Sequence, residues 1–239
     1  SLRASVFLFS FPRFAERLEA FCEAGISKTP PHSQKPPAHY HHHPITFCIL
    51  WGMELLAFLK QKNLFTEEEC IEIDDAFERE IIPKGEVIQK ISRYSQRILF
   101  IEAGILRVFY TDEGKDITHF YFEAGHFIAP IYSIYFNQSE RYEWEAVEAC
   151  RVRVVSYETF LGLEERYPKL TRVLLDFAIY MLDLFSQKLN LLQFQTAYDR
   201  YNLFLEMYPN LHHRVSLGSI ASFLGVTQQT LSVIRGKKK

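Results

Sequence analysis

The last residues of the chain combine side chains that can read bases with side chains that can bind phosphates. Gln228, Gln229 and Ser232 carry amide or hydroxyl groups, and Arg235 and Lys237 carry positive charge. A glutamine amide pairs well with N6 and N7 of adenine, and a cation beside the DNA backbone releases counterions. This combination indicates contact with double-stranded DNA.

The residues around these groups predict a helix-turn-helix that begins at Leu217. Ala221 is small enough to let two helices cross closely, Gly225 permits the turn, and the Thr227 hydroxyl can cap the second helix. The second helix then exposes Val233 beside the polar groups and enters the major groove. The buried positions carry Ile220, Leu224, Val226, Leu231 and Ile234. A helical hairpin without special function is the alternative interpretation.

Charge is unevenly distributed along a chain whose formal net charge is -2. From Met207 to the end there is no acidic residue, whereas acidic residues outnumber basic ones over 53–206. An acidic body with a basic end indicates that one end meets a polyanion. A solvated lysine tail is the alternative.

The cysteines lie far apart and form no C-x-x-C pair: they are Cys22, Cys48, Cys70 and Cys150. This spacing argues against a structural zinc site, an iron–sulfur cluster and a disulfide framework. We therefore predict reduced thiols in a cytosolic protein, with no metal and no cofactor.

Residues 1–52 differ in composition from the rest of the chain. They include the segment KTPPHSQKPPAHYHHHP, which is low in complexity and unable to build a core. We predict that 1–52 is a disordered or artificially appended extension. Its histidines offer a transition-metal site as a less favoured interpretation. Its apolar stretches are too short or interrupted for a membrane span or a signal peptide.

The middle of the chain has the pattern of a β domain. Short runs rich in Ile, Val, Phe and Tyr are bounded by glycines, which predicts the strands of a sandwich or barrel. These runs are RILFIEAG, ILRVFYTD, DITHFYFEAG and RVRVVSYE. Asp112, Glu113 and Gly114 supply the turn chemistry of a hairpin. A small-molecule-binding or cupin-like jelly roll is the competing class, although the β-rich middle lacks the metal-ligand pattern of H-x-H with a downstream glutamate.

The pattern after the β domain predicts one long helix with two apolar faces. One face follows the four-three spacing of a coiled coil at Leu170, Leu174, Phe177, Met181, Leu184, Lys188 and Leu191. The other face carries Val173, Leu182, Phe185, Leu189 and Leu192. Two stripes are more than one neighbour needs, so we expect a homodimer that charges at Leu174, Met181 or Leu184 would disrupt. A helix buried wholly within one chain is the alternative.

The order of β domain, long helix and helix-turn-helix resembles the Crp/Fnr family of transcription regulators. The segments IPKGEVI, TDEGKDITHFYFEAGHFI, RYP and DRY look like landmarks of that family. The resemblance implies an α+β fold: a cyclic-nucleotide-binding-like jelly roll over 53–167, a dimerisation helix over 168–196 and a DNA-binding domain over 197–239. It also implies non-enzymatic cytoplasmic homodimers on palindromic operators, contact with RNA polymerase, and a small-molecule effector in the jelly roll.

The chain departs from the family in the effector pocket. Members that bind cyclic AMP hold the ribose with a Gly-Glu pair and the phosphate with the arginine of an Arg-Ser or Arg-Ala pair. An ungapped match places Ala129 and Pro130 at the first pair and Glu140 and Arg141 at the second. If the loop shifts in register by one residue, Arg141 takes the arginine position and can still bind an anion. We therefore predict that cyclic AMP is not recognised in the family's way.

Further candidates for this pocket come from its loop and from the long helix. Tyr132 lies in the loop, and the helix contributes Met181, Phe185 and Ser186 by an ungapped match. Met181 and Phe185 replace an arginine and a threonine of the cyclic-AMP-binding relatives. We expect either a less polar effector or a cavity filled by aromatic side chains. A sensor of the arabinose-regulator type would need two helix-turn-helix units, and the sequence suggests one.

Overall fold

The structure is a computed structural model that describes residues 52–236. The extension predicted over 1–52, except Gly52, and the predicted phosphate contact Lys237 lie outside the described residues. The described chain begins with helices α2 (Leu55–Gln61) and α3 (Glu67–Asp75). Helix α3 begins with a capping box, in which Thr66 and Glu69 each accept the other's backbone N–H.

Two four-stranded antiparallel sheets form the β domain, in the orders β1-β8-β3-β6 and β2-β7-β4-β5. The strands are β1 (Glu78–Ile82), β2 (Val87–Gln89), β3 (Arg97–Ala103), β4 (Ile105–Asp112), β5 (Lys115–Glu123), β6 (Phe127–Ile128), β7 (Glu143–Ala146) and β8 (Cys150–Ser156). The four predicted runs are confirmed as β3, β4, β5 and β8. The fold class is also confirmed as α+β.

The hairpin between β4 and β5 is confirmed at the predicted residues. Asp112 pairs with Lys115, so Glu113 and Gly114 form a two-residue loop. Both have positive φ, 47° and 76°, which is the geometry of the turn that matches strand twist. The hairpin leaves β5 at the edge of its sheet.

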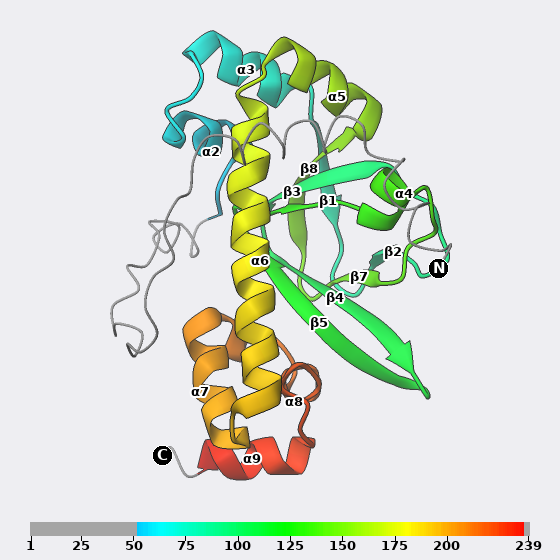
Figure 1. The fold of residues 1–239 in the computed structure, drawn as a ribbon, viewed down its shortest axis with the longest axis vertical. Coiled ribbons are helices and arrows are strands. Elements are labelled where there is room, and N and C mark those ends of the chain that lie inside the picture. Colours follow the sequence, from blue (N-terminus) through cyan, green and yellow to red (C-terminus); the bar gives the residue numbers. More distant parts are fainter. Residues whose placement is uncertain (1–51, 237–239) are drawn as a thin grey trace, which may run out of the picture. The chain divides into compact units, whose positions relative to one another are not determined.

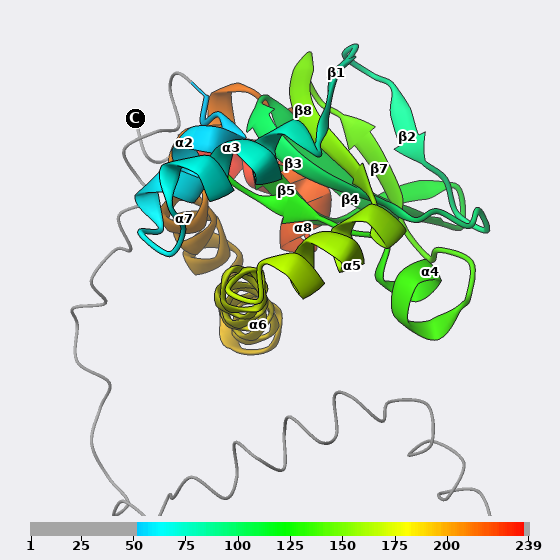
Figure 2. The same ribbon diagram turned by 90° about the horizontal axis from the view of Figure 1, so that it is seen from above.

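The core lies between the two sheets and continues under the long helix. Ile101, Leu106 and Phe120 are almost fully buried there, and Leu184 of the long helix joins the same cluster. Helices α4 (Ile131–Phe136) and α5 (Tyr157–Arg166) precede the long helix α6 (Leu170–Phe194) along the chain. Figure 1 shows α6 running past the sheets as one unbroken helix, and Figure 2 shows it end-on beside them.

The predicted division of α6 into two faces is correct, but the roles of the faces need correction. The face with coiled-coil spacing is the one buried against its own chain: Leu184 is 5% exposed and Leu191 is fully buried. The exposed large apolar side chains follow a neighbouring stripe of Leu175, Ile179, Leu182, Phe185, Leu189 and Leu192. Val173, predicted for that second face, is buried in the core.

Four short elements complete the described chain after α6. They are α7 (Ala197–Met207), a 3₁₀ turn η2 (Leu211–His213), α8 (Leu217–Leu224) and α9 (Gln228–Gly236). Among the described residues, no single helix has the length and apolar composition to cross a membrane.

Candidate nucleic-acid interface

Helices α8 and α9 form the predicted helix-turn-helix and are bent by 101° at the turn. Gly225 ends α8 with φ 64° and ψ 38°, a left-handed conformation that glycine adopts without steric cost. The Thr227 hydroxyl accepts the Thr230 N–H at 3.1 Å and caps α9, as predicted. Ser216 caps α8 in the same way through the N–H of Ser219, at 3.1 Å.

The buried side of the motif matches the sequence pattern closely. Four of the five predicted apolar positions are buried, and Val226 is half-buried. Phe223 also lies in this core at 1% exposure, with its ring centroid 5.5 Å from that of Phe204 and 5.8 Å from that of Tyr208. Its role could have been found from its place three residues after Ile220, which puts both on one helix face.

The opposite side of α9 is open to solvent. Gln229 and Ser232 are exposed, and Val233 is 59% exposed. Gln228 is exposed too, but its amide lies over α8: a β-carbon at Gly218 would come within 2.6 Å of the Gln228 Nε2. The structure therefore places the predicted reading residues on one short helix, with Gln228 turned towards α8.

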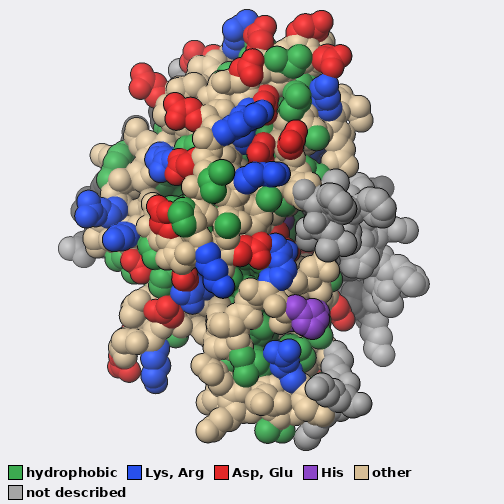
Figure 3. All heavy atoms as spheres, turned by 180° about the vertical axis from the view of Figure 1, so that it is seen from behind, with side chains coloured by type: hydrophobic (Ala, Val, Ile, Leu, Met, Phe, Trp, Pro, Cys, Tyr) green, Lys and Arg blue, Asp and Glu red, His purple; other side chains and the backbone are tan. Residues whose placement is uncertain are grey.

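The basic end predicted from the sequence is partly engaged by the protein itself. The Arg214 guanidinium is paired with Glu148 and lies 3.4 Å from Glu123. Arg235 is half-buried and forms no ion pair within residues 52–236. On the face opposite to that of Figure 1, acidic and basic side chains are interspersed (Figure 3). Arg214 is thus a bridge to the β domain and is not presented to a polyanion.

Arg200, in the DRY segment, connects the end of α6 to the helix-turn-helix. Its guanidinium donates to the carbonyl oxygens of Leu192, Gln195 and Leu224, each at 3.0 Å. Helix ends leave carbonyl groups without intrahelical partners, and an arginine fork satisfies several of them at once. Apart from the DRY segment itself, no sequence pattern indicated this role.

The predicted effector residues fall into two groups joined by aromatic rings. The Arg141 guanidinium lies over the Tyr132 ring of α4, 4.5 Å from the ring centroid. Pro130 is buried directly before α4. From α6, Phe185 packs 4.6 Å from Phe120, Met181 packs on the β core and the Ser186 side chain is exposed. The structure does not bring Ser186 to the others.

A row of rings fills the space between α4 and α6. Tyr132 lies 6.4 Å from Tyr142, which stacks on His119 at 4.9 Å, and His119 lies 5.7 Å from Phe185. Two cavities in the described chain are lined by residues within 52–61 and within 87–95, so neither is in this row. Burial and the charge of Lys188 lower the pKa of His119 to about 4.

Glu140 has a structural role that the sequence did not reveal. Its buried carboxylate accepts the backbone N–H of Ser133 at 2.8 Å and the Ser133 hydroxyl at 2.9 Å. An internal carboxylate therefore occupies the donors at the start of α4. A negative charge in this position opposes the approach of another anion.

Comparison with known proteins rests on structure alone, since no sequence model of a known family and no curated protein matches the chain. A CooA variant from Carboxydothermus hydrogenoformans matches with a TM-score of 0.58 and 20% identity, over 68% of this chain and 76% of that one. FixK2 from Bradyrhizobium japonicum gives 0.59 and 20%, over 67% and 83%. The chain has the Crp/Fnr-type regulator fold.

A third structure with this Crp/Fnr-type fold is CLP of Xanthomonas campestris, a c-di-GMP-responsive global regulator that links cell-cell signaling to virulence gene expression. It matches with a TM-score of 0.60 and 14% identity, over 72% of this chain and 91% of that one. The shared architecture is an antiparallel β core with a long helix and a C-terminal helix-turn-helix.

Proposed function

We propose that the chain is a sequence-specific DNA-binding transcription regulator that acts as a homodimer and has no enzymatic activity. The exposed face of α9 carries this proposal, because Gln229, Ser232 and Val233 project from a capped helix whose other side is buried. A helix of this kind fits the major groove and reads base edges from its first turns. The Crp/Fnr-type fold supports the assignment.

Selection of bound sequences from random DNA tests the proposal. We expect one two-fold symmetric site with a dissociation constant of about 10⁻⁸ to 10⁻¹¹ M, weakening as salt rises. Equal affinity for all sequences at every salt concentration would contradict it. Contacts with RNA polymerase and with a small-molecule effector stay predictions.

The Gln229→Ala substitution should relax the preference at one base pair and cost about 1–3 kcal/mol there, because it removes a bidentate amide from a base edge. Competition binding to the selected site and its single-base variants measures this change. Arg235→Ala serves as the contrast, since loss of a phosphate contact weakens all sequences about equally. An unchanged preference in Gln229→Ala and in Gln228→Ala would show that this face does not read the bases.

The partner proposed for α6 is the same helix of a second copy. Its exposed apolar stripe, defined by Leu175, Ile179, Leu182, Phe185, Leu189 and Leu192, spans most of a 25-residue helix at intervals of three or four residues. A stripe of this spacing is self-complementary in a two-fold dimer. Such a dimer would present two copies of α9 to the half-sites of a palindromic operator.

We also propose that cyclic AMP is not the effector. Millimolar cyclic AMP and cyclic GMP should produce no heat in calorimetry and no change in operator affinity. Two features support this: Glu140 places a carboxylate at the start of α4, and Pro130 has no backbone N–H to offer a phosphate. A micromolar dissociation constant for either nucleotide would overturn the prediction.

A further inference from the structure

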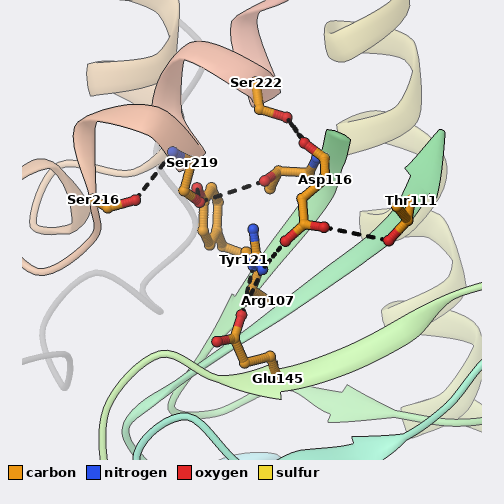
Figure 4. A network of polar contacts seen from close by, with 9 residues as sticks. Arg107, Thr111, Asp116, Tyr121, Glu145, Ser216, Ser219 and Ser222 are labelled. Carbon is orange, nitrogen blue, oxygen red and sulfur yellow. Dashed lines mark hydrogen bonds and ion pairs between the residues drawn. The ribbon is translucent and has the colours of Figure 1, made fainter. Parts of the chain in front are cut away.

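Helix α8 forms hydrogen bonds directly with the edge strand β5. The Ser222 hydroxyl donates to the carbonyl oxygen of Asp116 at 2.7 Å and accepts the N–H of Thr118 at 2.8 Å. Ser219, one turn earlier, is hydrogen-bonded to the Tyr121 hydroxyl and lies 3.4 Å from the Thr118 hydroxyl. Figure 4 shows these serines of α8 facing the strand. Ser222 thus takes the place of a strand neighbour at two backbone groups of β5, and Ser219 adds hydrogen bonds to side chains of the same strand.

Lys188 of α6 lies at the junction of these elements. Its side-chain nitrogen donates to the carbonyl oxygen of Thr118 at 3.2 Å and to that of His119. The same nitrogen lies 5.0 Å from the ring centroid of Phe120 and 4.3 Å from that of Phe223 on α8. The side-chain nitrogen of this α6 residue therefore contacts both β5 and α8.

The environment of Lys188 is unusual for a lysine. The residue is 8% exposed, and no carboxylate within residues 52–236 forms an ion pair with it. Backbone carbonyls and aromatic faces stabilise an ammonium group, but they do not replace the water it loses on burial. A leucine would continue the apolar spacing of this face, so a buried lysine here calls for a reason other than packing.

We propose that Lys188 is a positioning residue that fixes the orientation of the helix-turn-helix on the β domain through its contacts with β5 and α8. This inference rests on the proposed function. Since the exposed side of α9 stays open while α8 is bonded to β5, the contact orients the reading helix and does not cover it. A fixed orientation in each copy sets the distance between the two reading helices, and hence the spacing of half-sites.

The contact should also depend on pH. Burial lowers the pKa of Lys188 to about 7, whereas a lysine released to water has a pKa near 10.5. Between these values the bonded state binds fewer protons than the released state, so the contact strengthens as pH rises through this window and weakens towards pH 7. If Lys188 is fully released to water, the equilibrium constant between the bonded and released states changes by at most about 50-fold between pH 7 and pH 9.

The other ionisable groups near Lys188 do not account for such a dependence. His119, the neighbouring group on β5, has a pKa of about 4, and burial raises the pKa of Tyr121 to about 12. The Asp116 carboxylate is paired with Arg107 on β4, and α8 contains no ionisable side chain. Lys188 is therefore the group among these whose protonation differs most between the bonded and released states from pH 7 to pH 9.

Hydrogen exchange at the Thr118 amide tests the contact without DNA, because this N–H is held by Ser222. After correction for the intrinsic exchange rate, the equilibrium constant for opening at Thr118 should fall by up to about 50-fold from pH 7 to pH 9 in the wild type. The control variant Asn190→Met, which changes an exposed residue on the same helix, should show the same fall. In Lys188→Met the profile should be flat. A flat wild-type profile, or an equal slope in Lys188→Met, would overturn the pH-dependent contact.

Selection of DNA with varied half-site spacing tests the positioning role. Lys188→Met should keep the half-site sequence and accept a wider range of spacings than the wild type and Asn190→Met. Ser222→Ala, which removes the hydrogen bonds of Ser222 to Asp116 and Thr118 and keeps those of Ser219, should have the same effect and speed exchange at Thr118. Unchanged spacing in both variants would refute positioning. If no variant and no wild-type protein binds DNA, the proposed function fails, and the exchange profiles still decide whether Lys188 controls the contact.

Discussion

Leu182→Glu should convert the protein to a monomer and weaken operator binding by about 100- to 10,000-fold. Leu182 is 69% exposed at the middle of the exposed stripe of α6, so the substitution leaves the core of its own chain intact. A glutamate there would have to be buried against its symmetry mate in a dimer, which desolvates two like charges. A monomer engages a single half-site, and the gain from linking two binding events is lost.

Analytical ultracentrifugation at micromolar concentration and binding to the selected operator measure these effects. Asn190→Glu is the matched control, because it adds the same charge at an exposed position about 80° around the helix from Leu182. Leu184→Glu is not a test of assembly, since Leu184 is 5% exposed and lies in the β core. A dimeric Leu182→Glu protein with wild-type operator affinity would exclude α6 as the subunit interface.

Phe223→Ala should lower the free energy of unfolding by about 3–5 kcal/mol and abolish DNA binding. The ring is 1% exposed and packs against Phe204, Tyr208 and Tyr121, so its removal leaves a cavity between α8, α7 and β5. It also removes an aromatic face from the Lys188 ammonium group. Denaturant unfolding and operator binding give the two measurements.

Val233→Ala provides the comparison for Phe223→Ala within the same motif. At 59% exposure, Val233 should change stability by no more than about 0.5 kcal/mol. A loss below about 1 kcal/mol in Phe223→Ala would mean that α7 and the rest of the core close the cavity without this ring.

Elements defined by neighbouring residues were predictable from the sequence. The turn at Gly225, the cap at Thr227 and the two-residue loop after Asp112 depend on the conformation of a few consecutive residues. The long helix was predictable because its apolar period is sustained over 25 residues. Strands β2 and β6, with three and two residues, are too short to show a period.

The burial of α6 could not be predicted, because its two apolar faces satisfy the same helical period. Which face is buried depends on strands that are distant in sequence. The carbonyl groups that accept from Lys188, for example, lie 69 and 70 residues earlier in the chain. The role of Glu140 is similar, since its bonds to Ser133 require the loop after α4 to return to that helix. Neither contact leaves a local pattern.

The bonds between α8 and β5 have a consequence for solubility. Strand β5 is the outer strand of its sheet, and the Ser222 hydroxyl occupies the Thr118 N–H and the Asp116 carbonyl that another strand would otherwise use. Unpaired edges of this kind recruit strands from other molecules and start aggregation. The helix-turn-helix therefore also covers this edge of the β domain, and a truncation that ends before α8 would expose an edge prone to aggregation.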